Sequence, residues 1–91
     1  MTTEDTLARA ADLLERTGWC QKEWKTSDGK HCLLGALATV IADDDDLVHW
    51  RPAQRALKQE IGTDNLITWN NTPGRIAEEV IGALRNSKRH L

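Results

Sequence analysis

The stretch Cys32-Leu33-Leu34-Gly35-Ala36-Leu37-Ala38-Thr39-Val40-Ile41-Ala42 decides the fold, because it places apolar side chains on every face of a helix. A helix without a polar side needs neighbours all round, and its Gly and Ala residues let those neighbours approach closely. The stretch therefore predicts the central helix of a bundle. Its 11 residues are well short of the roughly 20 that cross a bilayer, so we expect no membrane association.

Three further helices are expected around this central one. Residues 4–16 carry an apolar stripe at helical spacing, Thr2 or Thr3 is placed to cap their start, and Gly18 follows their end. Pro52 suits a first helical turn, which predicts a helix over 52–61. Thr72 and Pro73 have the form of an N-cap and a first helical residue, which predicts a last helix over 73–86.

The segments between these helices carry no helical period. Residues 19–31 include the turn dipeptide Asp28-Gly29, which fits either an ordered loop or a small hairpin, and we favour a loop with a short strand pair. Residues 63–71 are expected to form a loop. The central helix is expected to stop near Ala42, with one of Asp44, Asp45 and Asp46 capping the element that begins at Leu47. The prediction is a single all-α domain over 1–91, a compact four-helix bundle with a short hairpin or ordered loop between its first two helices.

Composition excludes several classes of protein. Ninety-one residues suit one small domain, and a net charge of -2 lacks the basic excess of a general nucleic-acid binder. The acidic N-terminus has no signal-peptide order, which predicts a cytoplasmic protein, and its two cysteines are expected to be free thiols. The charge is nevertheless uneven: residues 1–46 hold 10 acidic and 5 basic side chains, and residues 47–91 hold 4 and 7.

Four tryptophans are the only aromatic residues, and all lie at or beyond the ends of the expected helices. Such residues fill gaps between helices in a small core, or they anchor a protein-binding hot spot. Trp24 and Trp50 are flanked by basic residues, so we expect them to be more exposed than Trp19 and Trp69.

The segment Trp69-Asn70-Asn71-Thr72-Pro73-Gly74-Arg75 is the most distinctive in the chain. Asn side chains stabilise turns through local backbone bonds, so it fits a loop that leads into a helix. Two amides and an arginine at a helix N-terminus also fit a site for an anion or carboxylate.

Two cysteines and two histidines hold the atoms of a zinc site, but their spacing lacks the close pairs that such sites use. No third group is placed to orient a thiol and a histidine base. We therefore expect no metal, no cofactor and no catalytic residue. These residues are Cys20, His31, Cys32 and His49.

Three segments together resemble a small uncharacterised domain family of actinobacteria and their phages. They are Gly18-Trp19-Cys20-Gln21, Gly29 to Leu37 with its Cys-Leu-Leu-Gly-Ala-Leu core, and Trp69 to Arg75. The resemblance spans nearly the whole chain. It implies an actinobacterial or actinophage origin and a cytoplasmic setting, the host cytoplasm for a phage protein, but it carries no activity.

The hypothesis that follows is a non-enzymatic protein-interaction module that binds and modulates a bacterial host protein, as a monomer or a homodimer. One alternative is a small-ligand or catalytic pocket near Trp69, Asn70 and Arg75, extending to His31. Another is a DNA-binding regulator that uses Arg55, Lys58 and the basic C-terminus, although the net charge disfavours nucleic acid. The candidate binding residues are Trp19, Gln21, Trp24, Trp50, Trp69, Asn70 and Arg75.

Overall fold

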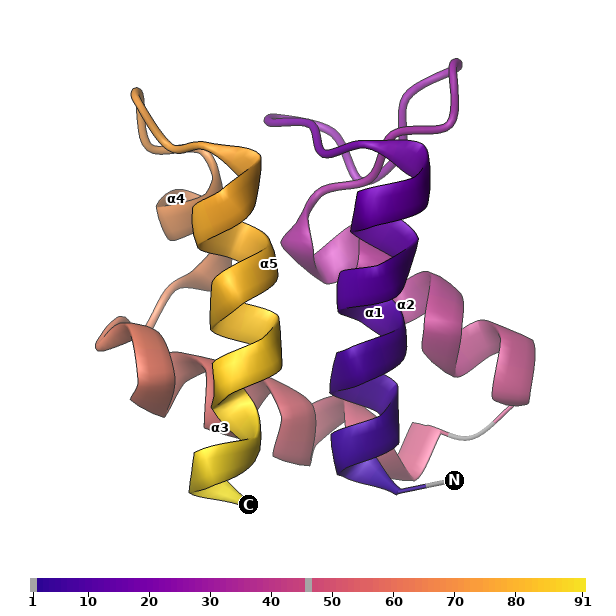
Figure 1. Cartoon of the computed structure of the whole chain (residues 1–91), viewed down its shortest axis with the longest axis vertical. Helices are drawn as coiled ribbons and strands as arrows, with labels where there is room; N and C mark the ends of the chain where they lie inside the picture. The colour runs from indigo at the N-terminus through magenta and orange to yellow at the C-terminus, as the bar shows by residue number, and fades with distance from the viewer. Residues whose placement is uncertain (1, 46) are drawn as a thin grey trace.

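The first and the last α-helix of the chain run antiparallel and lie side by side (Figure 1). A computed structural model describes residues 2–45 and 47–91. Its elements are α1 (Thr3–Thr17), α2 (Leu33–Asp44), the 3-10 helix η1 (Leu47–His49), α3 (Trp50–Ile61), α4 (Leu66–Asn70), α5 (Ala77–Asn86) and the 3-10 helix η2 (Ser87–His90). α1 packs against both α5 and α2, and α3 crosses behind the lower parts of α1 and α5 in the view of Figure 1. The described residues form no sheet, so the predicted all-α class is confirmed.

α1 forms where the apolar stripe predicts it. Its residues Leu7, Ala10, Ala11 and Leu14 are buried in the common core. At its start, the Thr2 hydroxyl accepts a hydrogen bond from the backbone N–H of Asp5 at 3.1 Å, and the Asp5 carboxylate accepts one from the Thr2 backbone N–H at 3.1 Å. This reciprocal capping satisfies two backbone donors that the first turn would otherwise leave unpaired.

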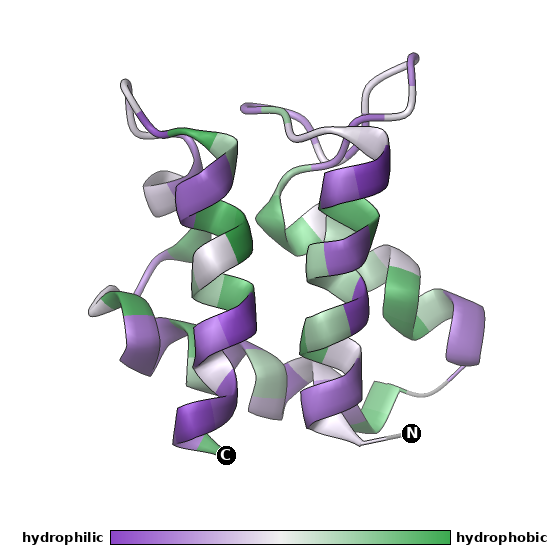
Figure 2. Ribbon diagram, viewed as in Figure 1, coloured by the Kyte–Doolittle hydropathy of each residue, from purple (hydrophilic) through white to green (hydrophobic). Residues whose placement is uncertain are grey.

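α2 is the central helix, as its apolar surface predicts, with seven buried residues from Leu33 to Ile41. It runs two residues beyond Ala42, so the expected end was wrong. Arg9 explains the extension, because its guanidinium bonds both carboxylate oxygens of Asp44 at 2.9 Å and offsets negative charge at the negative helix end. Figure 2 shows this hydrophilic last turn against the green and white turns before it. Asp45 caps the C-terminus of α2 rather than the next element, and the proposed cap at Asp46 lies outside the described residues.

α3 starts at Trp50, so Pro52 lies in its first turn as expected, and Gly62 ends it with a left-handed backbone at φ 81°. Ala53, Ala56 and Leu57 are buried against the other helices. The short side chains of the two alanines suit the crossing of α3 under its neighbours.

Residues 63–76 differ from the prediction in two ways. The expected loop contains the short helix α4, which Asn65 caps by accepting a hydrogen bond from the Thr68 N–H at 3.0 Å. The last helix starts at Ala77 rather than at Pro73. The Thr72 hydroxyl donates back to the Thr68 carbonyl, so Thr72 closes α4 instead of opening α5. Five α-helices therefore replace the expected four among the described residues.

Residues 18–32 form an ordered loop with isolated bridges, and no strand pair forms there. His31 fastens its two ends together, because its N–H donates to the Gly18 carbonyl at 3.1 Å and its carbonyl accepts from the Cys20 N–H at 3.0 Å. Together with residues 71–76, this loop lies at one end of the molecule (Figure 1). No helix among the described residues has the length and apolar character needed to span a membrane.

Candidate functional site

Asn70 is the centre of a hydrogen-bond network that joins α4 to the 18–32 loop. Its side chain is buried, and its Oδ1 accepts from the Trp19 indole N–H at 2.7 Å and from the Leu33 backbone N–H at 3.0 Å. Its Nδ2 donates to the Cys20 carbonyl at 3.2 Å and to Asn71 Oδ1 at 3.1 Å. An amide offers two donors and two acceptor positions, so all four are used inside the protein.

Gln21 and Asn71 add a second layer to this network. Gln21 Nε2 donates to the carbonyls of Asn70 at 3.1 Å and Thr72 at 2.9 Å. Asn71 Oδ1 accepts from the backbone N–H of Lys22 at 2.7 Å. We call Trp19, Gln21, Asn70 and Asn71 the asparagine latch, because their bonds hold the loop against α4.

Trp69 and Arg75 form a separate pair next to the latch. The Arg75 guanidinium carbon lies 4.0 Å from the centroid of the Trp69 ring, a cation–π contact, and Arg75 Nε donates to the Trp69 carbonyl at 3.1 Å. Arg75 Nη1 also bonds Glu79 at 3.1 Å. The carboxylate and carbonyl already hold this guanidinium, which weakens the case for an anion site.

The structure therefore brings together the residues that the sequence singled out, but it uses their polar groups internally. Trp19, Gln21 and Asn70 meet in the latch, and Trp69 and Arg75 stack beside it. None of the four hydrogen-bonding positions of Asn70 is left for a ligand. The arrangement is suited to fixing a loop.

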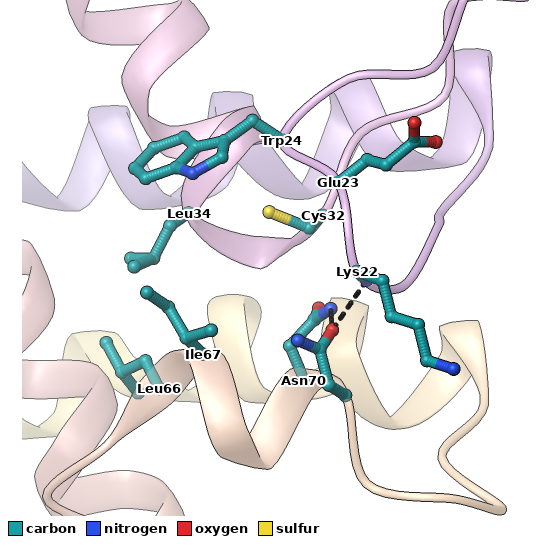
Figure 3. A pocket seen from close by; sticks show the side chains of 9 residues that line it. Lys22, Glu23, Trp24, Cys32, Leu34, Leu66, Ile67 and Asn70 are labelled. Carbon is teal, nitrogen blue, oxygen red and sulfur yellow. Dashed lines mark hydrogen bonds between the residues drawn. The ribbon is translucent and has the colours of Figure 1, made fainter.

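A small, mostly apolar pocket lies next to the latch, between the loop and α4 (Figure 3). Its free volume is about 60 Å³, room for a few water molecules or one small apolar side chain. In Figure 3 the Trp24 ring lies above Leu34, and Ile67 and Leu66 lie on the α4 side. The lining residues are Lys22, Glu23, Trp24, Cys32, Leu34, Leu66, Ile67, Asn70 and Asn71.

Trp24 stands at the rim of this pocket and stacks on Trp50, with the ring centroids 6.4 Å apart and the planes at 21°. Trp24 is 50% exposed, as the sequence predicts. Trp50 is less exposed than expected, because part of it packs against the hydrophobic core. We call Trp24, Trp50 and Ile67 the apolar face, and Leu34, which lines the pocket beside them, is buried.

Sequence reasoning missed Ile67, which is 51% exposed on α4. A five-residue helix shows no period of its own, and the segment was assigned to a loop. Leu47 and Val48, 79% and 66% exposed, are a second missed feature in the turn directly before Trp50. The sequence did contain a signal for these two residues, because they follow the aspartate run and belong to no apolar stripe that would bury them.

The cysteines and His31 have structural contacts. His31 is buried, its Nδ1 lies 3.2 Å from the Thr17 hydroxyl, and its Nε2 has no hydrogen-bond partner among the described residues. Burial lowers the pKa of His31, and the charge of Lys25 lowers it further. Burial raises the pKa of the Cys20 thiol, which works against a reactive thiolate.

Cys32 caps α2, because its Sγ accepts from the Gly35 N–H at 3.2 Å. The apolar run that follows Cys32 predicted a small core residue at this position, and Cys32 is buried. Among residues 2–45 and 47–91, no group of three His, Cys, Asp or Glu side chains is placed to hold a metal ion.

Comparison with known proteins shows the family of the chain. A protein-family model described as "Family of unknown function (DUF6197)" matches residues 1–90. No curated protein and no solved structure matches the chain.

Proposed function

The chain belongs to the DUF6197 family of unknown function, and from its geometry we propose that it is a non-enzymatic protein-interaction module. The observation that carries the proposal is the stack of Trp24 on Trp50, in which Trp24 is half exposed and lines an apolar pocket. Binding energy at protein interfaces concentrates in aromatic anchors beside pockets that a partner side chain can fill.

The asparagine latch supports this function because it fixes the backbone that carries Trp24. Gln21 and Lys22, which directly precede this part of the loop, are bonded to residues of the 70–72 segment. On the other side, the Trp24 carbonyl accepts from the Cys32 N–H at 3.2 Å. A binding surface that is ordered before contact loses less conformational entropy on association.

Gly35 makes this placement of Trp24 possible. A Cβ added at Gly35 would overlap the Trp24 carbonyl oxygen, so only glycine lets the loop lie this close to α2. The close approach sets the position from which the Trp24 ring reaches Trp50. Gly35 therefore helps to position the binding surface although it contributes no side chain to it.

The proposed partner is a bacterial host protein whose activity the module alters. We place the protein in an actinobacterial or actinophage setting and in the bacterial cytoplasm, on the resemblance of its Trp19–Gln21, 29–37 and 69–75 segments to that domain family. The apolar face consists of indole and aliphatic groups, which supply neither an acid–base pair nor a nucleophile.

The test compares cross-linking from two positions of equal exposure. A photoreactive amino acid replaces Ile67 on the apolar face or Ile76 before α5, which are 51% and 52% exposed. Each protein is illuminated in actinobacterial lysate, and the products are identified by mass spectrometry. We expect one dominant partner from position 67, absent from position 76 and lost in a Trp24→Ala background that remains helical by circular dichroism.

Identical products from both positions would overturn the proposal, because they would report exposure alone. The same holds if the product from position 67 persists undiminished in the Trp24→Ala background.

A further inference from the structure

The solvent side of α3 carries three exposed basic residues. Arg51, Arg55 and Lys58 are exposed at i, i+4 and i+7, and none forms an ion pair with a described residue. This spacing puts them along one side of the helix. Four of the five arginines outside α3 are paired with a carboxylate, namely Arg9, Arg75, Arg85 and Arg89, and Arg16 forms no ion pair with a described residue.

These cations border the apolar face. Trp50, Arg51, Gln54, Arg55 and Lys58 line one open groove of about 340 Å³. Trp50 belongs to both the groove and the apolar face, because it lines the groove and its ring stacks on Trp24. An apolar surface with aliphatic and indole groups therefore continues directly into a cationic groove.

We propose that the occupant of this combined surface is an acidic amphipathic segment of the partner protein. Its apolar side chains cover Trp24 and Ile67, and its carboxylates lie over the α3 cations. This inference rests on the proposed function and adds the chemistry of the partner. Charge complementarity of this kind raises the association rate and selects among partners.

The same surface is less suited to a nucleic acid. Single strands bind through exposed aromatic faces on which bases stack, but here the two indoles stack on each other. In the neighbouring pocket, Leu34, Leu66 and Ile67 offer no partner to a phosphate or a base edge, and the carboxylate of Glu23 offsets the charge of Lys22. The net charge of -2 also works against binding a polyanion non-specifically.

The test uses three defined probes and the indole N–H signals of the four tryptophans in NMR spectra. The first probe is an amphipathic peptide of about 16 residues, with Leu at i, i+3, i+4 and i+7 and Glu on the other face. The second has Lys in place of each Glu, and the third is single-stranded oligodeoxythymidine. We expect the acidic peptide to shift the signals of Trp24 and Trp50 and to leave that of Trp19, which is bonded to Asn70.

Two variants with the same change in net charge separate the groove from the rest of the surface. Arg55→Glu/Lys58→Glu reverses the groove, and Arg16→Glu/Lys88→Glu reverses two exposed cations outside it. We expect the first to weaken the acidic peptide about tenfold and the second less than about twofold. The affinity should also fall as salt is added.

Each other outcome overturns the inference in a recognisable way. Equal binding of acidic and basic peptides would remove the charge selection and leave the apolar face as a binding surface. Tighter binding of oligodeoxythymidine, lost on groove reversal, would assign the groove to nucleic acid. Concentration-dependent shifts of the same two indoles without any probe would assign it to a second copy of this chain. No shift with any probe would exclude the combined surface, and the cross-linking result from position 67 would then judge the proposed function separately.

Discussion

Trp19 and Trp24 are five residues apart in one loop and have opposite environments. The Trp19 indole N–H is bonded to buried Asn70, and its ring packs against the core. Trp24 is half exposed, stacks on Trp50 and lines the pocket between the loop and α4. The comparison separates two uses of the same residue type: Trp19 holds the loop in place, and Trp24 is an aromatic group that the loop exposes to solvent.

The largest effect is expected from breaking the latch at Asn70. Asn70→Ala removes four hydrogen bonds and leaves the buried Leu33 N–H and the Trp19 indole N–H without their acceptor. We expect a loss of about 3 kcal/mol in the free energy of unfolding, measured by urea denaturation. Asn86→Ala is the control, since that side chain is exposed. Equal losses in the two variants would contradict the central role of the latch.

The second effect concerns the fit between the loop and α2. Gly35→Ala places a methyl group against the Trp24 carbonyl, so we expect about 2 kcal/mol of destabilisation and a shift of the Trp24 indole signal. Gly82→Ala is the matched helical control, because nothing lies within 4 Å of its added Cβ. Alanine is the better helix former, so this control should gain about 0.5–1 kcal/mol. A gain of similar size at Gly35 would show that the loop is free to move away.

A third pair of variants compares the two tryptophans directly. Trp19→Phe removes a partly buried hydrogen bond to Asn70, whereas Trp24→Phe keeps an aromatic ring on Trp50 and removes no described hydrogen bond. We expect the first to cost about 1.5 kcal/mol and the second less than about 0.5 kcal/mol in thermal or urea unfolding. We expect the opposite order in the cross-linking experiment, where the change at Trp24 should reduce the product from position 67 more than the change at Trp19. Equal stability losses would mean that the two indoles do not differ as described.

The smallest effect is a pH dependence from His31, which closes the loop. Because its pKa is lowered in the folded protein from 6.5, the unfolded chain takes up the proton first as pH falls. Stability is therefore complete above about pH 6.5 and decreases below it, no more steeply than about 1.4 kcal/mol per pH unit for one proton. Unfolding measured between pH 8 and 5 should show this decrease, and His31→Gln should reduce it. An unchanged slope in His31→Gln would assign the decrease to other groups.

Local pattern predicted the helices that bury a regular stripe. The Leu7–Leu14 stripe located α1, and the apolar run after Cys32 located α2, because burial at helical spacing leaves a direct mark on the sequence. The sequence placed the start of the last helix at Pro73, because Thr72 and Pro73 have the form of an N-cap and a first helical residue when their tertiary contacts are unknown. In the structure Thr72 instead closes α4. The five residues of α4 are too few to show a helical period in the sequence.

The latch shows why the site itself was harder to predict. Trp19, Gln21 and Asn70 were selected as unusual residues, yet their bonds join positions 49–51 residues apart. Whether an asparagine caps its own turn or bonds a distant indole depends on which element packs beside it. No local pattern contains that information.

The amino-acid sequence by itself determined that this chain forms an all-α domain with a fully apolar central helix, because periodic burial is a local property. Only the tertiary structure decided that the Trp19 indole is bonded to Asn70 and that the Trp24 ring stacks on Trp50. The physical reason is the fit of one loop between α2 and α4, where Gly35 leaves the room and Asn70 supplies the hydrogen bonds. Both contacts come from elements outside the loop.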